Sequence, residues 1–418
     1  MVSLARKNLI EDLPRFLVAQ AGIMFAVSLV ALQTGIFNGF TRSTAQLINN
    51  TDADIWIASD KLVQVELTLP LPVTNLLKAQ KVEGVERAEG VIFSSAFWLP
   101  AEGEIAVVRM VGFDPNGQLF TPNNITQGTL KSLKKPYSIM LDTTNLKSLR
   151  IKGIGNVAQV NSLPAELVGL TQGNNSIVSN AFMFTSLENA KAYLTNGQTS
   201  QISCQLPSAG KELICTNTYP NTSKTQTQTA TPALPEKLVA SDLITYVLIR
   251  AKPGEDLQLL KEKLDTVLPN TRAYTRAEFT QKNQLFWQQR TGIGFILGLG
   301  AAVGVMVGTI IVGQILYTSV SEHLKEFGTL KAIGASNGVI YSVIIEQALW
   351  MSILGYIPSM AICYGVASWA FATQGILILI TPVSAIAILG LTIVMCVGSA
   401  IFAIQKVTRL DPAVVFKA

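Results

Sequence analysis

The chain has 418 residues, of which 49% are hydrophobic and 14% are charged, and its formal net charge is +5. Ordinary soluble proteins carry about 25% charged residues, so this composition excludes a chain that lies wholly in water. The small positive charge is spread over the chain and gives no case for nucleic-acid binding.

The first 16 residues mix leucine and isoleucine with charged residues, which predicts a helix in the cytoplasmic membrane interface. An unstructured basic tail is the alternative. We expect Pro14 to kink the chain into a first membrane span at residues 17–39. The apolar run has no small-residue cleavage site, so we interpret it as a retained anchor and not as a secretory signal.

Residues 40–290 contain alternating and apolar runs separated by turn residues, which predicts a mixed α/β domain between the first and second spans. Strands are predicted at 53–58, 85–97, 104–113 and 246–250, and helices at 74–81, 186–194 and 255–268. The last helix is followed by a strand that ends near Tyr274. This order predicts one βαβ unit directly before the chain returns to the membrane.

Residues 205–236 are rich in threonine and almost free of aliphatic side chains, which predicts a flexible insertion. A partner-binding tip is the sharper alternative. Cys204 and Cys215 close a short loop in this region, and they form either a disulfide, if the compartment is oxidising, or two free thiols. Cys363 and Cys396 fall in apolar runs and are interpreted as buried thiols.

Three further apolar runs predict membrane spans at residues 291–320, 337–366 and 378–405, since a span needs about 20 residues. A connector at 367–377 and a tail at 406–418 complete the chain. The aromatic and polar run before the second span predicts that this helix projects into the outer domain as a rigid rod. The fold class is therefore a four-helix membrane protein with an inserted α/β domain.

Glycines in the second span recur every fourth residue, at Gly300, Gly304 and Gly308. This small-xxx-small stripe lets another helix backbone approach closely. Packing within the chain's own four helices and dimerisation are equally compatible with the spacing.

Basic residues in the short flanks of the spans predict the orientation of the chain. These residues are Arg6, Lys7, Arg15, Lys325, Lys331, Lys406, Arg409 and Lys417. Both termini are then cytoplasmic, and residues 40–290 lie on the outer side of a multi-pass plasma-membrane protein.

The familiar catalytic motifs are missing from the sequence. No phosphate-binding P-loop, H-E-x-x-H, C-x-x-C or G-x-S-x-G motif occurs, and His323 is the single histidine. Glu346 is the one ionisable residue inside a predicted span, so a proton relay through the helices is not expected. We therefore predict a chain that is not an enzyme and that receives its energy from a partner.

The segment 321–336 is a short charged stretch between two spans and is called the coupling segment here. Charged and apolar residues interleave in it as in an amphipathic helix, with Gly328 as a flexible point and Gly334 as a helix cap. It either docks in a groove of a cytoplasmic partner or rests on lipid headgroups. The predicted coupling residues are Glu322, Leu324, Lys325, Phe327, Gly328, Leu330, Lys331 and Gly334.

Three motifs occur in the last third of the chain: H-L-K-E-F-G-T-L-K-A-I-G-A-S at 323–336, I-I-E-Q-A at 344–348 and R-L-D-P-A at 409–413. They resemble the FtsX-type permease domain of MacB-like ABC transporters. The first of them, together with A-G-I-M-F-A at 21–26, is most similar to the DevC-type permeases of cyanobacteria. The outer domain matches the family in position and size more than in motif, and the insertion at 205–236 has no match.

The resemblance implies a homodimeric inner-membrane permease whose coupling segment binds a separate ATPase subunit. ATP and magnesium would be bound by that ATPase, and this chain would hold no cofactor. Mechanotransmission to the periplasmic core domain would then drive export through a periplasmic adaptor protein and a TolC-like outer-membrane channel. The rival functions are a signalling scaffold that activates a periplasmic hydrolase and a lipoprotein-releasing permease.

Overall fold

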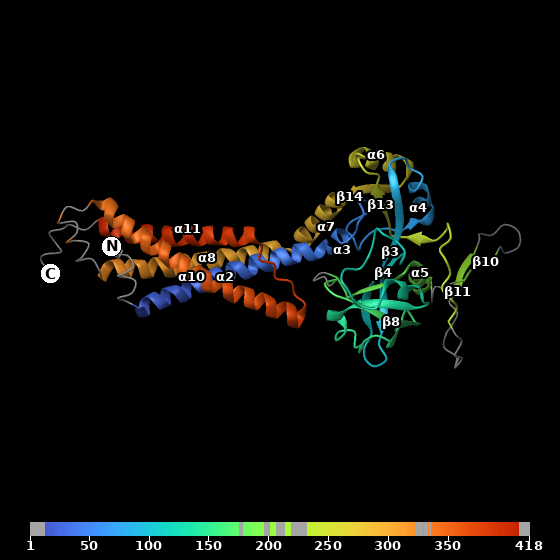
Figure 1. Ribbon diagram of the computed structural model, residues 1–418, viewed down its shortest axis with the longest axis horizontal. Coiled ribbons are helices and arrows are strands. Elements are labelled where there is room, and N and C mark those ends of the chain that lie inside the picture. Colours follow the sequence, from blue (N-terminus) through green and yellow to red (C-terminus); the bar gives the residue numbers. More distant parts are fainter. Residues whose placement is uncertain are drawn as a thin grey trace. The chain divides into compact units, whose positions relative to one another are not determined.

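The computed structural model describes residues 13–174, 179–195, 201–205, 214–218, 232–322, 329, 333 and 336–408. The chain divides into two compact units, which Figure 1 shows as ribbons. The membrane unit comprises Met1–Arg42 and Gln288–Ala418, and the inserted domain comprises Ser43–Trp287. Four candidate membrane helices and an inserted α/β domain confirm the predicted fold class.

The described part of the membrane unit contains four long helices: α2 (Leu13–Thr44), α8 (Ile293–Glu322), α10 (Asn337–Gln374) and α11 (Pro382–Thr408). They run beside one another in Figure 1, and each contains a stretch long and apolar enough to cross a membrane. The buried residues of α2 recur three or four positions apart and lie on one face: Ala19, Ile23, Ala26, Val27, Val30 and Ala31. Helix α2 therefore contributes a continuous apolar face to the centre of the unit.

The amino-terminal boundary differs in part from the prediction. Helix α2 is described from Leu13, and the chain before it, on which the predicted kink at Pro14 depends, lies outside the described residues. Residues 13–16 of the predicted interfacial helix thus belong to α2, and its other residues lie outside the described part of the chain.

The predicted connector at 367–377 is also too long. Helix α10 continues to Gln374 and ends at Gly375, which adopts a left-handed conformation (φ 66°) and donates its N–H to the Phe371 carbonyl. Helix α11 begins at Pro382, and Thr381 accepts the N–H of Ser384 at 3.1 Å as a helix cap. The connector therefore runs only from residue 375 to 381, because apolar composition alone does not mark where a helix ends.

The predicted rigid rod is interrupted. One residue, Gly292, separates helix α7 (Arg276–Thr291) from α8, and it has φ 60°. A glycine adopts this left-handed conformation without the steric cost that other residues incur. The two helices are therefore separate elements joined at a glycine.

The long strand β3 (Val85–Leu99) organises the inserted domain (Figure 1). Its first half pairs with β13 (Tyr246–Ala251), and the sheet continues through β1 (Ile55–Ser59) to β14 (Thr271–Thr275). We call these four strands the open lobe. The second half of β3 pairs with β4 (Ala106–Phe113).

A closed ring of strands forms the rest of the sheet. From β4 it passes to β9 (Phe182–Ser186), β6 (Ser138–Asp142), β8 (Leu163–Thr171) and β7 (Val157–Val160). Strand β7 also pairs with β3, which completes a six-stranded ring called the closed lobe here. The short strand β5 (Ile125–Gln127) extends it beside β8, so β3 belongs to both lobes.

Short elements complete the domain. The helices are α3 (Gln46–Asn49), α4 (Val73–Ala79), α5 (Leu187–Thr195) and α6 (Leu257–Val267), with 3-10 turns at Leu130–Lys134 and Thr143–Asn145. Strand β2 (Leu71–Pro72) pairs with β12 (Leu243–Ile244), and β10 (Gln201–Gln205) pairs with β11 (Ile214–Thr218). The predicted βαβ unit is β13–α6–β14, except that β1 lies between its two strands.

Helix α7 starts with a capping box. Thr275 donates its N–H to the Glu278 carboxylate at 2.9 Å, and Glu278 donates its N–H to the Thr275 hydroxyl at 3.3 Å. Burial works against the charged carboxylate, but the Lys261 ammonium at 2.6 Å and the Thr275 bonds outweigh it and lower the pKa of Glu278. The charged form of Glu278 therefore stabilises the start of α7.

We expect Glu278→Gln to destabilise the first turn of α7 at neutral pH by about 0.3 to 1 kcal/mol, since it removes a negative charge from the helix N-terminus. The pKa of Glu278 is lower in the folded protein than in the unfolded chain. The charged carboxylate therefore adds to the free energy of unfolding above the usual carboxylate range, and this stabilisation is lost as the pH falls through the lowered pKa. Amide hydrogen exchange of α7 in the full chain measures the effect. Glu262→Gln on the exposed face of α6 is the control, and equal exchange in both variants would contradict the prediction.

Candidate functional site

The coupling segment lies between α8 and α10. Glu322 is the last residue of α8, and the other predicted coupling residues, Leu324, Lys325, Phe327, Gly328, Leu330, Lys331 and Gly334, lie outside the described residues. Thr329 and Ile333 are described, and the Ile333 N–H donates to the Thr329 carbonyl at 3.0 Å, as in a helical turn. The Ile333 side chain is 79% exposed. An exposed isoleucine on a helical turn is the kind of side chain that docks against a partner or lipid.

The glycine stripe of α8 faces α2 of the same chain. A Cβ atom added at Gly300, Gly304 or Gly308 would lie 2.2 to 2.8 Å from side-chain atoms of Gln33, Leu29 and Ala26, respectively. Real Cβ contacts are not this short, so these glycines permit the close approach of the two helices. Of the two predicted uses of the stripe, the structure contains packing within the chain.

A second close approach involves two glycines that are not among the predicted packing residues. Gly35 and Gly39 of α2 lie against the connector, whose Leu379 N–H donates to the Gly35 carbonyl at 2.9 Å. Asn38 donates from Nδ2 to the Leu379 carbonyl at 3.3 Å. The GxxxG spacing of this pair is the sequence signal that would have indicated the contact.

Buried polar side chains of the membrane helices are neutral wherever the structure describes them. They are Gln20, Ser43, Thr44, Gln347, Ser352, Ser359, Thr392 and Ser399, whereas Glu346 is half-buried. Gln20 donates to the Met351 carbonyl, and Ser359 donates to the Gly355 carbonyl at 2.6 Å. The described spans therefore offer no chain of buried ionisable groups along which protons could pass.

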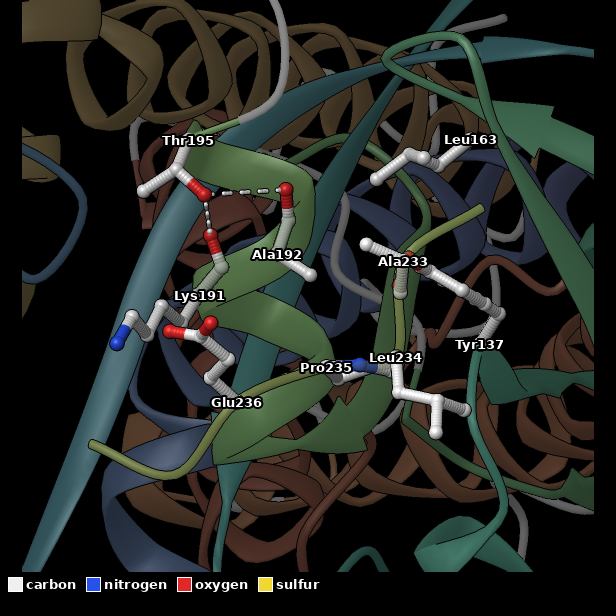
Figure 2. A pocket seen from close by; sticks show the side chains of 9 residues that line it. All are labelled: Tyr137, Leu163, Lys191, Ala192, Thr195, Ala233, Leu234, Pro235 and Glu236. Carbon is white, nitrogen blue, oxygen red and sulfur yellow. Dashed lines mark hydrogen bonds between the residues drawn. The ribbon is translucent and has the colours of Figure 1, made fainter. Parts of the chain in front are cut away.

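The inserted domain contains a cavity of about 330 Å³ beside α5 (Figure 2). Residues 233–236 form one wall, and the Tyr137 hydroxyl donates to the Ala233 carbonyl. Lys191 pairs with Asp242 at 2.8 Å and donates to the Lys237 carbonyl at 3.2 Å. Burial opposes the charge on Asp242, but Lys191 and a backbone N–H outweigh it and lower the pKa of Asp242. Lys191 therefore bonds Lys237 and Asp242 to α5, and Tyr137 bonds Ala233 to the chain just before β6.

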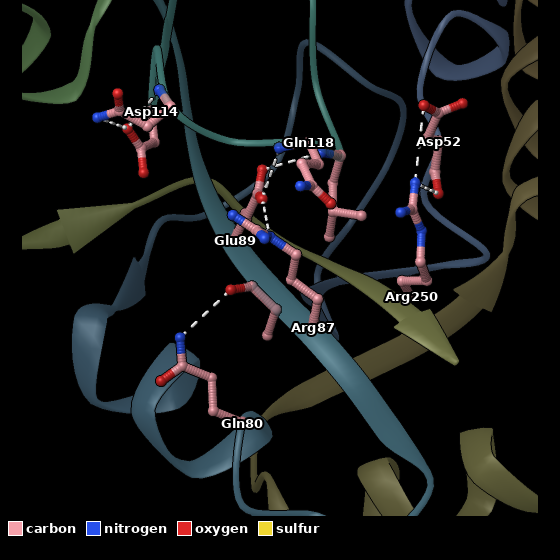
Figure 3. A network of polar contacts seen from close by, with 10 residues as sticks. Asp52, Gln80, Arg87, Glu89, Asp114, Gln118 and Arg250 are labelled. Atoms are coloured by element: carbon pink, nitrogen blue, oxygen red, sulfur yellow. Dashed lines mark hydrogen bonds and ion pairs between the residues drawn. The ribbon is translucent and has the colours of Figure 1, made fainter. Parts of the chain in front are cut away.

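A neighbouring cavity of about 380 Å³ is lined by the turn at residues 114–116, the start of α5 and the same segment. Glu89 of β3 bonds the residues that follow this turn, as Figure 3 shows for Gln118. Its buried carboxylate accepts the N–H groups of Gln118 and Leu119 at 2.8 and 3.0 Å and contacts Arg87. Within the described residues, no group of three or more metal-ligating side chains occurs here or elsewhere.

The predicted flexible insertion at 205–236 needs a correction at two places. Residues 214–218 form strand β11, and residues 233–236 pack beside α5. Cys204 and Cys215 stand directly opposite each other in the β10–β11 ladder. Opposed residues in an antiparallel pair have Cα atoms about 4.5 to 5.5 Å apart, a separation that a disulfide can bridge. The remaining residues of the insertion lie outside the described part of the chain.

We expect Cys204 and Cys215 to form a disulfide in an oxidising compartment. Peptide mapping of the full chain without reduction should yield one cross-linked peptide that disappears on reduction. Cys363 and Cys396 are buried free thiols and serve as internal controls. Modification of both Cys204 and Cys215 by a thiol reagent before reduction would contradict the prediction.

Comparison with known proteins gives two family matches that together cover most of the chain. Residues 16–267 match the MacB-like periplasmic core domain, and residues 294–412 match the FtsX-like permease C-terminal domain. The first match covers more than half of the chain and includes the inserted domain. The second match includes α8, α10 and the coupling segment.

Two curated relatives are named for export. The macrolide export ATP-binding/permease protein MacB of Hyphomonas neptunium is 30% identical over 125 residues, which are 30% of this chain and 19% of that protein. The pyoverdine export ATP-binding/permease protein PvdT of Pseudomonas fluorescens is 30% identical over 162 residues, which are 37% of this chain and 22% of that protein. The matched segment thus spans about a fifth of the length of these relatives.

Among solved structures, the periplasmic region of MacB from Actinobacillus actinomycetemcomitans aligns with a TM-score of 0.34 at 9% identity and covers 56% of this chain and 94% of that chain. The extracellular domain of the transporter YknZ from Gram-positive bacteria aligns with a TM-score of 0.34 at 9% identity and covers 53% of this chain and 99% of that chain.

Proposed function

Because the chain belongs to the family of ABC transporter permeases with a MacB-like periplasmic core domain and an FtsX-like C-terminal domain, we propose that it is the permease subunit of a tripartite exporter. In this role it carries no catalytic site. A separate ATPase subunit binds ATP and magnesium and holds the coupling segment. The permease acts as a homodimer and passes the motion of the ATPase to its inserted domain.

The observation that carries this proposal is the coupling segment between two membrane-spanning helices of an FtsX-like domain. Neutral buried groups in the described spans support an energy source outside the membrane helices. The relatives named for macrolide and pyoverdine export favour export over hydrolase activation or lipoprotein release.

The proposal extends to partners and location. We place the chain in the inner membrane, with both termini in the cytoplasm as the basic flanks predict. A periplasmic adaptor and a TolC-like outer-membrane channel would carry the cargo onward from the inserted domain. The H-L-K-E-F-G-T-L-K-A-I-G run favours a DevC-type exporter of a cyanobacterial envelope.

Co-purification with the candidate ATPase tests the proposal. We expect Phe327→Asp to weaken binding of the ATPase at least about tenfold, because a charge replaces an apolar docking side chain. Leu234→Asp, at an exposed leucine of the inserted domain, is the matched control and should bind normally. Unchanged ATPase binding and ATP turnover with Phe327→Asp would count against the docking role.

A further inference from the structure

Three residues on one face of α7 bond the chain that enters the inserted domain. Arg276, Thr280 and Asn283 are four and three positions apart, so they lie along one side of the helix. Arg276 donates to the Thr51 carbonyl at 2.9 Å, Thr280 donates to the Asn49 Oδ1 at 2.9 Å, and Asn283 donates to the Thr44 carbonyl at 2.5 Å. We call these three contacts the polar seam. Figure 1 shows α7 and α3 beside each other at this place.

Asn283 uses both ends of its side-chain amide. It is 0% exposed, and its Oδ1 accepts the Val65 N–H at 3.0 Å while its Nδ2 donates to the Thr44 carbonyl. Thr44 is the last residue of α2, and the final carbonyls of a helix have no partner within the helix. One amide therefore connects the end of α2, helix α7 and the loop around Val65.

The loop around Val65 continues this path into the sheet. The Tyr246 hydroxyl of β13 donates to the Val65 carbonyl at 2.7 Å. The next residue, Glu66, pairs with Arg109 of β4 at 2.6 Å, and their side chains are only 9% and 14% exposed. The seam is thus connected to the open lobe through β13 and to the closed lobe through β4.

A buried amide with both ends bonded fixes an alignment more strictly than apolar packing does. If α7 slipped by one turn along the entering chain, the Asn283 amide and its two partners would lose their hydrogen bonds inside the domain. Each unpaired buried polar group costs about 1 to 3 kcal/mol. Leucine or phenylalanine side chains at the same positions would tolerate such a slip with smaller losses.

From these contacts we infer that Asn283 is a positioning residue that sets the register of α7 against the entering chain, so that the two connections to the membrane unit move as one body. The register is a property of the inserted domain alone. Its use in transmitting ATP-driven motion rests on the proposed function. The seam then converts a push on either connection into movement of both lobes.

Disulfide trapping in the full chain tests the register. The pair Asn49→Cys and Thr280→Cys replaces two side chains that touch, whereas Asn49→Cys with Gln284→Cys reports a slip of one turn. In the otherwise unchanged protein we expect the first pair to cross-link and the second to remain reduced. Adding Asn283→Leu should shift the ratio toward the slipped pair by about tenfold or more, as loss of two buried hydrogen bonds implies.

Gln281→Leu removes an amide from the exposed side of α7 and is the matched control. A lower melting temperature of Asn283→Leu with an unchanged cross-linking ratio would overturn the inference, because that result describes stability alone. Cross-linking of the first pair that falls when ATP and the ATPase are added would also overturn it, since the seam would then open. Failure of the ATPase to bind would reject the proposed function and leave the register result standing.

Discussion

Gly39→Val should disrupt the packing of the membrane unit. A Cβ atom at this position would lie 1.7 Å from the Leu377 carbonyl oxygen and 2.8 Å from its carbon. These are backbone atoms, so no rotamer change can relieve the clash and the connector must move. The displacement also breaks the hydrogen bonds that Leu379 makes with Gly35 and Asn38. We expect a loss of about 3 kcal/mol or more from overpacking and lost hydrogen bonds.

Thermal unfolding of the purified full chain in detergent measures this loss. In a Leu379→Cys background, the thiol at position 379 should react faster with a thiol reagent when Gly39→Val is also present, because the connector then leaves the α2 surface. Gly398→Val is the matched control, since a Cβ atom there meets nothing within 4 Å. Equal melting temperatures of the two valine variants would show that the connector does not lie on α2.

Glu66→Ala should have the largest effect within the inserted domain. It leaves the Arg109 guanidinium largely buried without its carboxylate partner. Removing one partner of a buried ion pair costs about 3 to 5 kcal/mol, whereas replacing both partners by apolar residues is often nearly neutral. We therefore expect the double variant Glu66→Leu with Arg109→Leu to recover most of the stability that Glu66→Ala loses.

Hydrogen exchange of β4 and of the loop around Val65 measures this effect in the full chain. Asp60→Ala is the control, because its pair with Lys61 is exposed and such pairs contribute less than about 1 kcal/mol. If Glu66→Leu with Arg109→Leu were as unstable as Glu66→Ala, the loop around Val65 would depend on the ion pair itself.

The membrane helices were readily predictable because a missing charge over more than 20 residues is a strong signal. The first and last residues of these helices were harder to predict. Helix α10 ends before Gly375 and helix α11 begins at Pro382, and both boundaries depend on capping geometry that composition does not reveal. The break at Gly292 separates α7 from α8 within a stretch whose helical pattern continues on both sides.

The two lobes of the inserted domain differ in how well the sequence predicts them. Strands β1, β3, β4 and β13 agree with predicted runs, whereas β6 and β9 in the closed lobe were not predicted. Strands β1, β6 and β9 all have five residues and are buried throughout, so β1 was the only strand of this kind that the sequence indicated. A short strand buried on both faces lacks the alternation that identifies a strand. The closure of the ring by β7 depends on pairing with β3, some 60 residues earlier in the chain, and no local pattern indicates it.

The functional residues also differ in how well the sequence predicts them. The coupling segment stands out in the sequence because it is charged between apolar spans. By contrast, Asn283 lies in a polar stretch in which no residue type or spacing distinguishes it from Gln281 or Gln284. Its importance comes from partners at Thr44 and Val65, which are more than 200 residues away in sequence.

The position of β1 between β13 and β14 has a consequence for how such a chain could arise. The first main strand after the membrane helix and the last strand before the return are hydrogen-bonded neighbours at one edge of the sheet. The domain therefore begins and ends at nearly the same place, and Thr44 and Asn283 are bonded directly. Domains with adjacent ends can be inserted into another fold or removed from it with little disturbance. The inserted domain is thus a module that recombination could exchange between permeases while leaving the order of the membrane helices unchanged.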